Sequence, residues 1–143
     1  MHEVFVSFNI AKRLKWLGFN WPCADYWVND NDSNNGHEHW VVDRMTDDGT
    51  PSTNEEDVVL SRPTICTTAK WLREVKGIHI CIWNNACGYG WELSKAGANG
   101  TGISVYDDKG DDKDSGMWTT FDGCLTAAIL HAINLLERRG GCL

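Results

Sequence analysis

Long apolar runs are missing from this sequence. No stretch of its 143 residues approaches the roughly 18 to 20 consecutive apolar residues that cross a bilayer. The N-terminal stretch alternates apolar and charged residues, whereas a signal peptide has a continuous apolar segment. We therefore expect a cytoplasmic protein that does not insert into a membrane, and we interpret its six cysteines as free thiols.

The sequence also has few of the residue patterns that carry chemistry. His37 and His39 are two residues apart near two aspartates, but no further ligands follow at the spacing of a zinc site. The same acidic stretch begins like an EF-hand loop and has Val41 where that loop needs a bidentate glutamate. A strand, not a phosphate-binding helix, is expected after the glycine-rich residues 97–102. We predict that the protein is not an enzyme and needs no metal or cofactor, with a metal at His37 and His39 as the open alternative.

Composition indicates an ordinary globular chain with an uneven charge. Apolar residues make up 42% and charged residues 23%, far from the disordered class. A chain of 143 residues can bury one core, so we predict a single domain over residues 1–143. Most of the acids behind the net charge of −7 lie in residues 25–62 and 106–123, in Asn-, Gly- and Ser-rich stretches typical of solvated loops. The other segments are mildly basic.

Three segments show the periodicity of an amphipathic helix. Each follows a capping side chain, at Ser7, Thr64 and Thr120, and the first two end at a glycine. Apolar residues recur within each segment at intervals of three or four, which is the spacing of one helix face. The residues expected on these buried faces are Ile10, Leu14 and Leu17, then Ile65, Ala69 and Leu72, and finally Leu125, Ala128, Ile129, Ala132, Ile133 and Leu136.

Alternation of apolar and polar residues predicts strands between these helices. Residues 23–28 and 39–42 flank a polar loop and predict a hairpin. Three further alternating stretches follow the second helix, at residues 78–83, 89–93 and 103–105. Residues 44–62 show no sustained period, apart from a candidate short strand at 58–60. The order α-β-β-α-β-β-β-α predicts an α+β domain with an antiparallel sheet and helices packed on one face.

Three segments together resemble a known group of proteins: SFNIAKRLKWLGFNWPC, PTICTTAKWLREVKGIHI and TFDGCLTAAILHAINLL. In this order and spacing they are similar to uncharacterised small proteins of phages and mobile elements of gut Bacteroides-type bacteria. The resemblance covers about two thirds of the chain and leaves out residues 29–38 and 107–116. It implies a small intracellular protein of the phage type and supplies no activity that could be carried over to this chain.

Tryptophan is the residue in excess, with 8 of the 15 aromatic side chains. Several of these residues lie beside the cleanest apolar registers, which favours partial exposure, although tryptophan also fills small cores. Exposed indoles are typical of partner surfaces. We therefore expect an exposed aromatic patch drawn from Trp16, Trp27, Trp40, Trp71, Trp83 and Trp91.

The leading functional hypothesis is a non-catalytic protein-interaction module with an unidentified protein partner, or with a second copy of the chain covering the patch. The alternative is nucleic-acid binding, because residues 64–137 follow the helix, three strands, helix order of a double-stranded-RNA-binding domain. The acidic stretches oppose contact with phosphates. A basic surface for this alternative requires the first two helices to lie together and would comprise Lys12, Arg13, Lys15, Lys70, Arg73 and Lys76.

Overall fold

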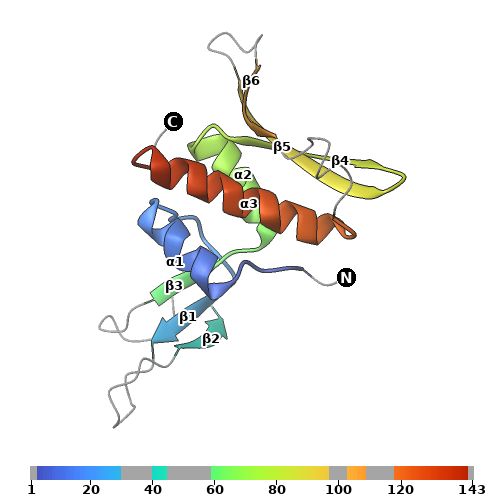
Figure 1. Ribbon diagram of the computed structural model, residues 1–143. Helices are drawn as coiled ribbons and strands as arrows, with labels where there is room; N and C mark the ends of the chain where they lie inside the picture. Colours follow the sequence, from blue (N-terminus) through green and yellow to red (C-terminus); the bar gives the residue numbers. More distant parts are fainter. Residues whose placement is uncertain (1–2, 30–39, 45–58, 97–102, 109–117, 142–143) are drawn as a thin grey trace. The chain divides into compact units, whose positions relative to one another are not determined.

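The computed structural model describes residues 3–29, 40–44, 59–96, 103–108 and 118–141 (Figure 1). It confirms the α+β class with antiparallel sheets. Contacts group the chain into two compact units, unit 1 with Met1–Val4 and Ile65–Leu143, and unit 2 with Phe5–Thr64. The single domain stays a prediction. The elements are α1 (Phe8–Trp16), β1 (Asp25–Asn29), β2 (Trp40–Arg44), β3 (Val59–Arg62), α2 (Ile65–Val75), β4 (His79–Asn85), β5 (Gly88–Ala96), β6 (Ile103–Asp108) and α3 (Phe121–Arg138).

The observed order differs from the predicted one by one strand, β3, which precedes α2. The described strands also form two three-stranded sheets, β2-β1-β3 and β4-β5-β6, where the sequence suggested one. Strand β3 overlaps the candidate short strand at 58–60, which the predicted order left out because four residues contain little alternation. Its pairing with β1 specifies it, because Leu60 lies opposite Trp27 in the antiparallel register.

Unit 2 consists of α1 and the β2-β1-β3 sheet. The predicted hairpin strands pair antiparallel, with Trp27 opposite Val42. Helix α1 begins as predicted, because the Ser7 hydroxyl accepts a hydrogen bond from the Ile10 amide at 3.2 Å. It ends before Gly18, which has a φ of 97°. The buried stripe of α1 contains Ile10 and Leu14, as predicted, and packs against β3.

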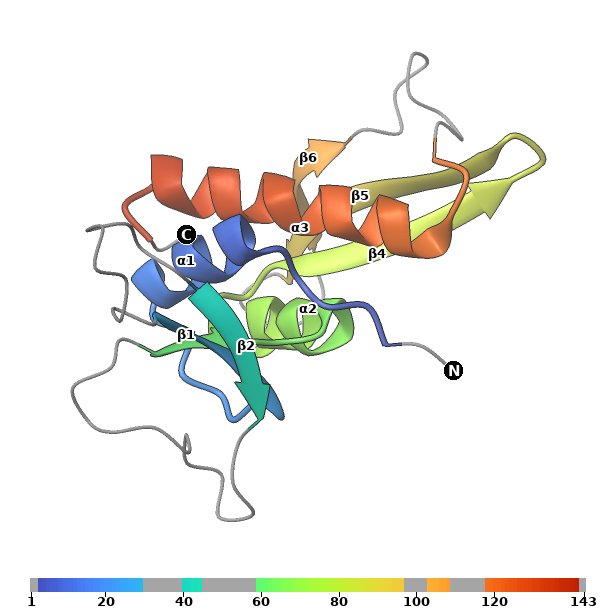
Figure 2. The ribbon, with the colours of Figure 1, turned by 90° about the horizontal axis from the view of Figure 1, so that it is seen from below.

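Unit 1 consists of the β4-β5-β6 meander with α2 and α3. Helix α3 packs on β4 and β5, and α2 packs on α3 and β4 (Figure 2). The Thr120 hydroxyl accepts from the Gly123 amide at 3.0 Å and caps α3 as predicted. The predicted stripe of α3 is buried, which confirms it. In the sheet, Ile80 lies opposite Leu93 and Ile82 opposite Trp91.

A tryptophan ring covers a glycine on the other face of this sheet. Trp83 of β4 lies opposite Gly90 of β5. The indole ring occupies the space into which a side chain at position 90 would project. Gly90 is buried although it has no side chain, because the ring covers it. The glycine is therefore a packing requirement of this strand pair.

None of the helices in the described part of the chain is both long and apolar enough to span a membrane.

Candidate functional site: the aromatic-basic groove of unit 2

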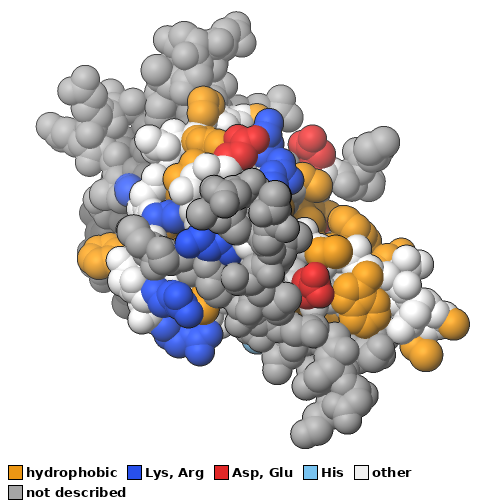
Figure 3. Space-filling model, turned by 90° about the horizontal axis from the view of Figure 1, so that it is seen from above, with side chains coloured by type: hydrophobic (Ala, Val, Ile, Leu, Met, Phe, Trp, Pro, Cys, Tyr) orange, Lys and Arg blue, Asp and Glu red, His pale blue; other side chains and the backbone are white. Residues whose placement is uncertain are grey.

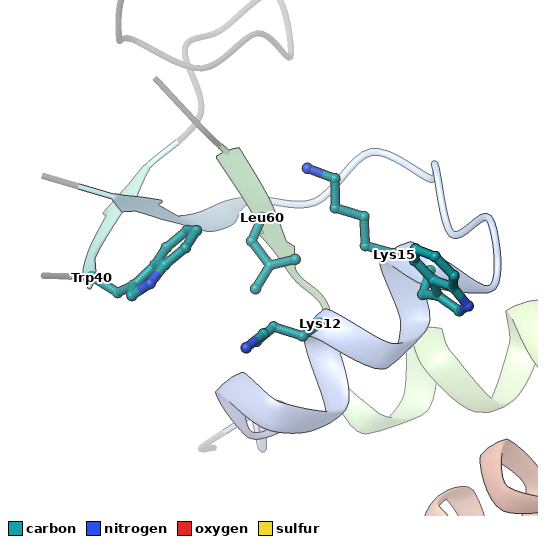
Figure 4. A pocket seen from close by; sticks show the side chains of 5 residues that line it. Lys12, Lys15, Trp40 and Leu60 are labelled. Carbon is teal, nitrogen blue, oxygen red and sulfur yellow. The ribbon is translucent and has the colours of Figure 1, made fainter. Parts of the chain in front are cut away.

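Unit 2 contains a hollow of about 400 Å³ on its surface, which we call the aromatic-basic groove. Five residues line it: Lys12, Lys15 and Trp16 of α1, Trp40 of β2 and Leu60 of β3 (Figure 4). The helix supplies both charges, and the sheet supplies only apolar lining. The groove therefore combines a positively charged side with an apolar side.

The spacing of α1 explains how one short helix supplies three of these residues. Lys15 and Trp16 follow Lys12 by three and four residues, so both flank the same face of the helix as Lys12. This face is separate from the buried stripe that contains Ile10 and Leu14. The Trp16 side chain is 87% exposed, the most exposed of the large hydrophobic residues described. Lys12 extends toward the side of the groove where Trp40 lies (Figure 4).

Pairing of the strands places Trp40 and Leu60 on the same face of the sheet. Trp40 lies opposite Asn29 and Leu60 opposite Trp27, and these two partners are two residues apart on β1. Residues separated by two along a strand point to the same side. Leu60 is buried and forms the floor, whereas the Trp40 ring is half-buried.

Aromatic contacts fix the Trp40 ring. Its centroid lies 5.0 Å from that of Phe8, which also meets Trp27 edge to face at 5.5 Å and 84°. The Lys12 ammonium lies 5.5 Å from the centre of the Phe8 ring. Pairs of this geometry contribute about 0.5 to 1.5 kcal/mol each beyond their buried area. Phe8, Trp27 and Trp40 therefore form a preformed aromatic wall in unit 2.

Arg62 supports the same wall from β3. Its guanidinium lies 4.1 Å from the centre of the Phe5 ring and 5.5 Å from that of Trp27. The same group forms a 3.3 Å ion pair with the carboxylate of Asp25. Because all three interactions converge on one guanidinium, Arg62 positions Trp27, which in turn contacts Phe8.

The structure divides the predicted aromatic patch between the two units. Trp16, Trp27 and Trp40 belong to unit 2, and the first and last of them line the groove. Trp83 belongs to unit 1, where it is half-buried over Gly90. Within unit 2, Trp27 and Trp40 both contact Phe8, and Trp40 shares the groove with Trp16.

The expected exposure is wrong for Trp71 and Trp91, whose side chains are 0% and 1% exposed. Trp71 lies on α2 next to Leu72, within the face that packs against the rest of unit 1. Trp91 lies on the same face of β5 as Leu93, and its ring centroid is 4.7 Å from that of His131 on α3. Both rings fill the core. The buried stripe of α2 is wider than the register of Ile65, Ala69 and Leu72. Trp91 lies within the predicted alternating stretch 89–93, on a strand that α3 packs against.

The predicted basic residues are likewise distributed over two helices. On α1, Lys12 and Lys15 are exposed and line the groove, and Arg13 is half-buried. In the space-filling view, Lys and Arg side chains reach the surface among hydrophobic ones (Figure 3).

On and after α2, Lys70 and Arg73 are exposed. Lys76 is half-buried and donates a 2.7 Å hydrogen bond to the carbonyl of Gly141. Its ammonium also lies 5.7 Å from the centre of the Trp71 ring. Lys76 therefore contributes to the packing of unit 1, in addition to carrying a positive charge.

Acidic residues are concentrated outside the described segments. Eleven of the twenty lie in residues 30–39, 45–58 and 109–117, against two of the thirteen basic residues. The candidate metal pair His37 and His39 also lies outside the described residues. Within the part of the chain that the structure describes, no three His, Cys, Asp or Glu side chains gather as a metal site would require.

The described cysteines are free thiols with contrasting surroundings. Burial raises the pKa of Cys23 to about 11, although a hydrogen bond with Ser61 acts in the opposite direction. Burial also raises the pKa of Cys124. A nucleophilic cysteine requires a lowered pKa, so neither thiol is activated for catalysis. Cys66, Cys81 and Cys87 are exposed.

Sequence reasoning identified four of the five groove residues but missed Leu60. It also missed the supporting residues Phe8 and Arg62. The register of β3 against β1 would have predicted Leu60 and Arg62, because it brings both residues to the side of the sheet that carries Trp27 and Trp40.

Comparison with known proteins adds no relative: no family model, no curated protein and no solved structure matches this chain.

Proposed function

We propose that this chain is a small phage-type protein of the cytoplasm that acts as a non-catalytic protein-interaction module. In this proposal, the aromatic-basic groove binds a short peptide segment of a partner protein, with a carboxylate and a large apolar side chain. The observation that carries the proposal is the 87% exposed Trp16 beside a preformed apolar hollow.

Apolar burial would provide most of the binding free energy. A tryptophan side chain buries on the order of 200 Å² when covered, which corresponds to roughly 5 kcal/mol before the costs of association. Trp71 and Trp91 already use this gain inside unit 1, whereas Trp16 does not. The Leu60 floor and the Trp40 wall offer further apolar surface to an inserted side chain.

Charge favours a peptide with few carboxylates over a polyanion. Lys12 and Lys15 match one or two negative groups at the groove. The chain as a whole has a net charge of −7, which repels a partner with many negative charges. A peptide with one or two carboxylates gains the local attraction and experiences little of this repulsion.

Nucleic-acid binding is the second candidate. Lysines next to aromatic side chains are also the composition of single-strand binding grooves, where bases stack on the rings. Exposed Lys70 and Arg73 on α2 add to this candidate. The order α2-β4-β5-β6-α3 is that of double-stranded-RNA-binding domains, but the first turn of α3 carries Asp122 where phosphate contact would favour a base.

Site-specific photo-crosslinking tests the proposal. A photoreactive phenylalanine analogue replaces Trp16 in the full chain, and a matched control carries it at Leu130, which is 37% exposed on α3. Both proteins are irradiated in a lysate of the encoding organism, with and without nuclease treatment. We expect a protein crosslink at position 16 that is absent at position 130 and survives nuclease treatment.

Measurements with the purified partner complete the test. Trp16→Ala and Lys12→Glu should each weaken its binding at least about tenfold, because they remove an apolar anchor and reverse a charge. Val75→Ala, at an exposed position of α2, should leave binding unchanged. A crosslink to nucleic acid would support the second candidate. Equal binding by all variants would reject the groove as the site.

A further inference from the structure

Among the residues that the structure describes, the two sheets have four edge strands, β2, β3, β4 and β6. An edge strand presents backbone groups that can pair with another chain, and proteins usually protect such strands with charges, proline or bulges. Three of the four edges carry these features. They are Asp43 and Arg44 in β2, Arg62 followed by Pro63 at β3, and Asp107 and Asp108 in β6, which also has a register shift against β5.

Strand β4 lacks all of these features. It spans His79–Asn85 and contains no Lys, Arg, Asp, Glu or proline, and it is the longest of the four edges. Its register with β5 is continuous over seven pairs. Within the described residues, β4 pairs with β5 alone, and β5 separates it from β6 (Figures 1 and 2). Cys81, Asn84 and Asn85 are exposed, and Ile80 and Ile82 are half-buried.

We propose that β4 is a self-association strand, which pairs antiparallel with β4 of a second copy of this chain. The β4-β5-β6 sheet of one copy and that of the second copy then form one continuous six-stranded sheet around a twofold axis. The register that pairs all seven residues places the axis at Ile82. Ile82 then lies opposite Ile82 of the second copy, and Cys81 lies opposite Trp83 of the second copy.

This register suits the side chains on both faces. The Ile82 side chain is on the face of the sheet that carries Trp91, against which α3 packs, so the pair of isoleucines extends the apolar core. On the other face, Cys81 lies opposite Trp83 of the second copy, whose ring leans over Gly90 of its own β5 and leaves room beside Cys81. The exposed edge of β4 and the two Ile82 side chains are covered in one step.

Charge favours a second copy at this strand over the other edges. Two copies that each carry a net charge of −7 repel one another, so an association site must keep like charges apart. No Asp or Glu of β4 would face its equivalent across the pair. The sequence of β6, by contrast, includes Asp107 and Asp108, so a strand pair between two copies of β6 would contain four acidic residues.

The dimer should be weak and dependent on concentration. A pair of seven-residue strands buries less than the roughly 1,200 to 2,000 Å² of a standard stable interface. Self-association is independent of the proposed function, because the groove residues lie on α1, β2 and β3. The same sample can therefore dimerise whether or not the groove binds a peptide.

Sedimentation equilibrium of the full chain under reducing conditions tests the proposal. Wild type is compared with Cys81→Lys and with Cys66→Lys, which introduces the same charge at an exposed cysteine of α2. We expect a monomer–dimer equilibrium for wild type and for Cys66→Lys. Cys81→Lys should associate at least tenfold more weakly, because each new lysine protects the edge of β4.

Two further variants keep the result decisive. Asn84→Lys introduces a charge at a second exposed position of β4 and should also weaken association, even if Cys81→Lys fails to fold by far-ultraviolet circular dichroism. Trp16→Ala should leave association unchanged. The proposal is overturned if wild type remains monomeric at its highest soluble concentration, if the folded β4 variants dimerise like wild type, or if Trp16→Ala alone abolishes the dimer.

Discussion

Gly90 offers the sharpest test of the packing in unit 1. A Cβ atom on Gly90 would overlap the Cε2, Cζ2 and Cη2 atoms of the Trp83 ring. Gly90→Ala must therefore displace the indole ring from the strand pair. Overpacking of this kind lowers the free energy of unfolding by about 1 to 3 kcal/mol. The ring is half-buried and can turn toward solvent, so we expect a loss within this range.

The same substitution should act differently once the ring is removed. In a Trp83→Ala background, Gly90→Ala meets no obstacle, and alanine should raise the free energy of unfolding by about 0.5 to 1 kcal/mol relative to glycine in a strand. Urea denaturation of the four proteins, followed by far-ultraviolet circular dichroism, gives the coupling free energy between the two positions. We expect at least about 1.5 kcal/mol. An equal loss in both backgrounds would show that the ring does not occupy this space.

Three further predictions concern caps, core and thiols. Ser7→Ala should lower the free energy of unfolding by about 1 kcal/mol in urea, because the Ile10 amide loses its acceptor. Leu136→Ala should cost about 2 to 5 kcal/mol in the same assay, and a loss below 1 kcal/mol would contradict its burial. Cys23 should react with iodoacetamide at pH 8 roughly a hundredfold more slowly than an ordinary thiol, as followed by mass spectrometry, because its pKa is raised to about 11. Since the folded chain keeps this proton after the unfolded chain has released it, stability should fall as pH rises from about 9 to 11.

Much of the fold is predictable because local signals and tertiary packing agree. The Ser7 and Thr120 caps and the apolar stripe of α3 each specify a helix without knowledge of the rest of the chain. Strand β3 is different, because its four residues indicate only a candidate strand, at 58–60, with too little alternation to place it in the predicted order. Its structure depends on β1, whose residues lie more than thirty positions earlier in the sequence.

The residues of the groove could likewise be predicted only in part. Lys12, Lys15 and Trp16 share a helix face by spacing alone, so the sequence places them together. Only the registers of β2 and β3 with β1 bring Trp40 and Leu60 to a common face of the sheet. Exposure of tryptophan was hardest to predict, because Trp71 occupies a core position directly beside the residues of the narrow stripe.

The path of the chain between its two units has a consequence of its own. Unit 2 begins after Val4 and ends before Ile65, and the Ile65 amide donates to the Val4 carbonyl at 2.9 Å. Two residues further into unit 2 from each of these positions, the Val6 amide donates to the Pro63 carbonyl at 3.0 Å. Residues 5–64 therefore leave and rejoin unit 1 at two points that a backbone hydrogen bond holds together. A change in the length of this segment need not move Val4 away from Ile65.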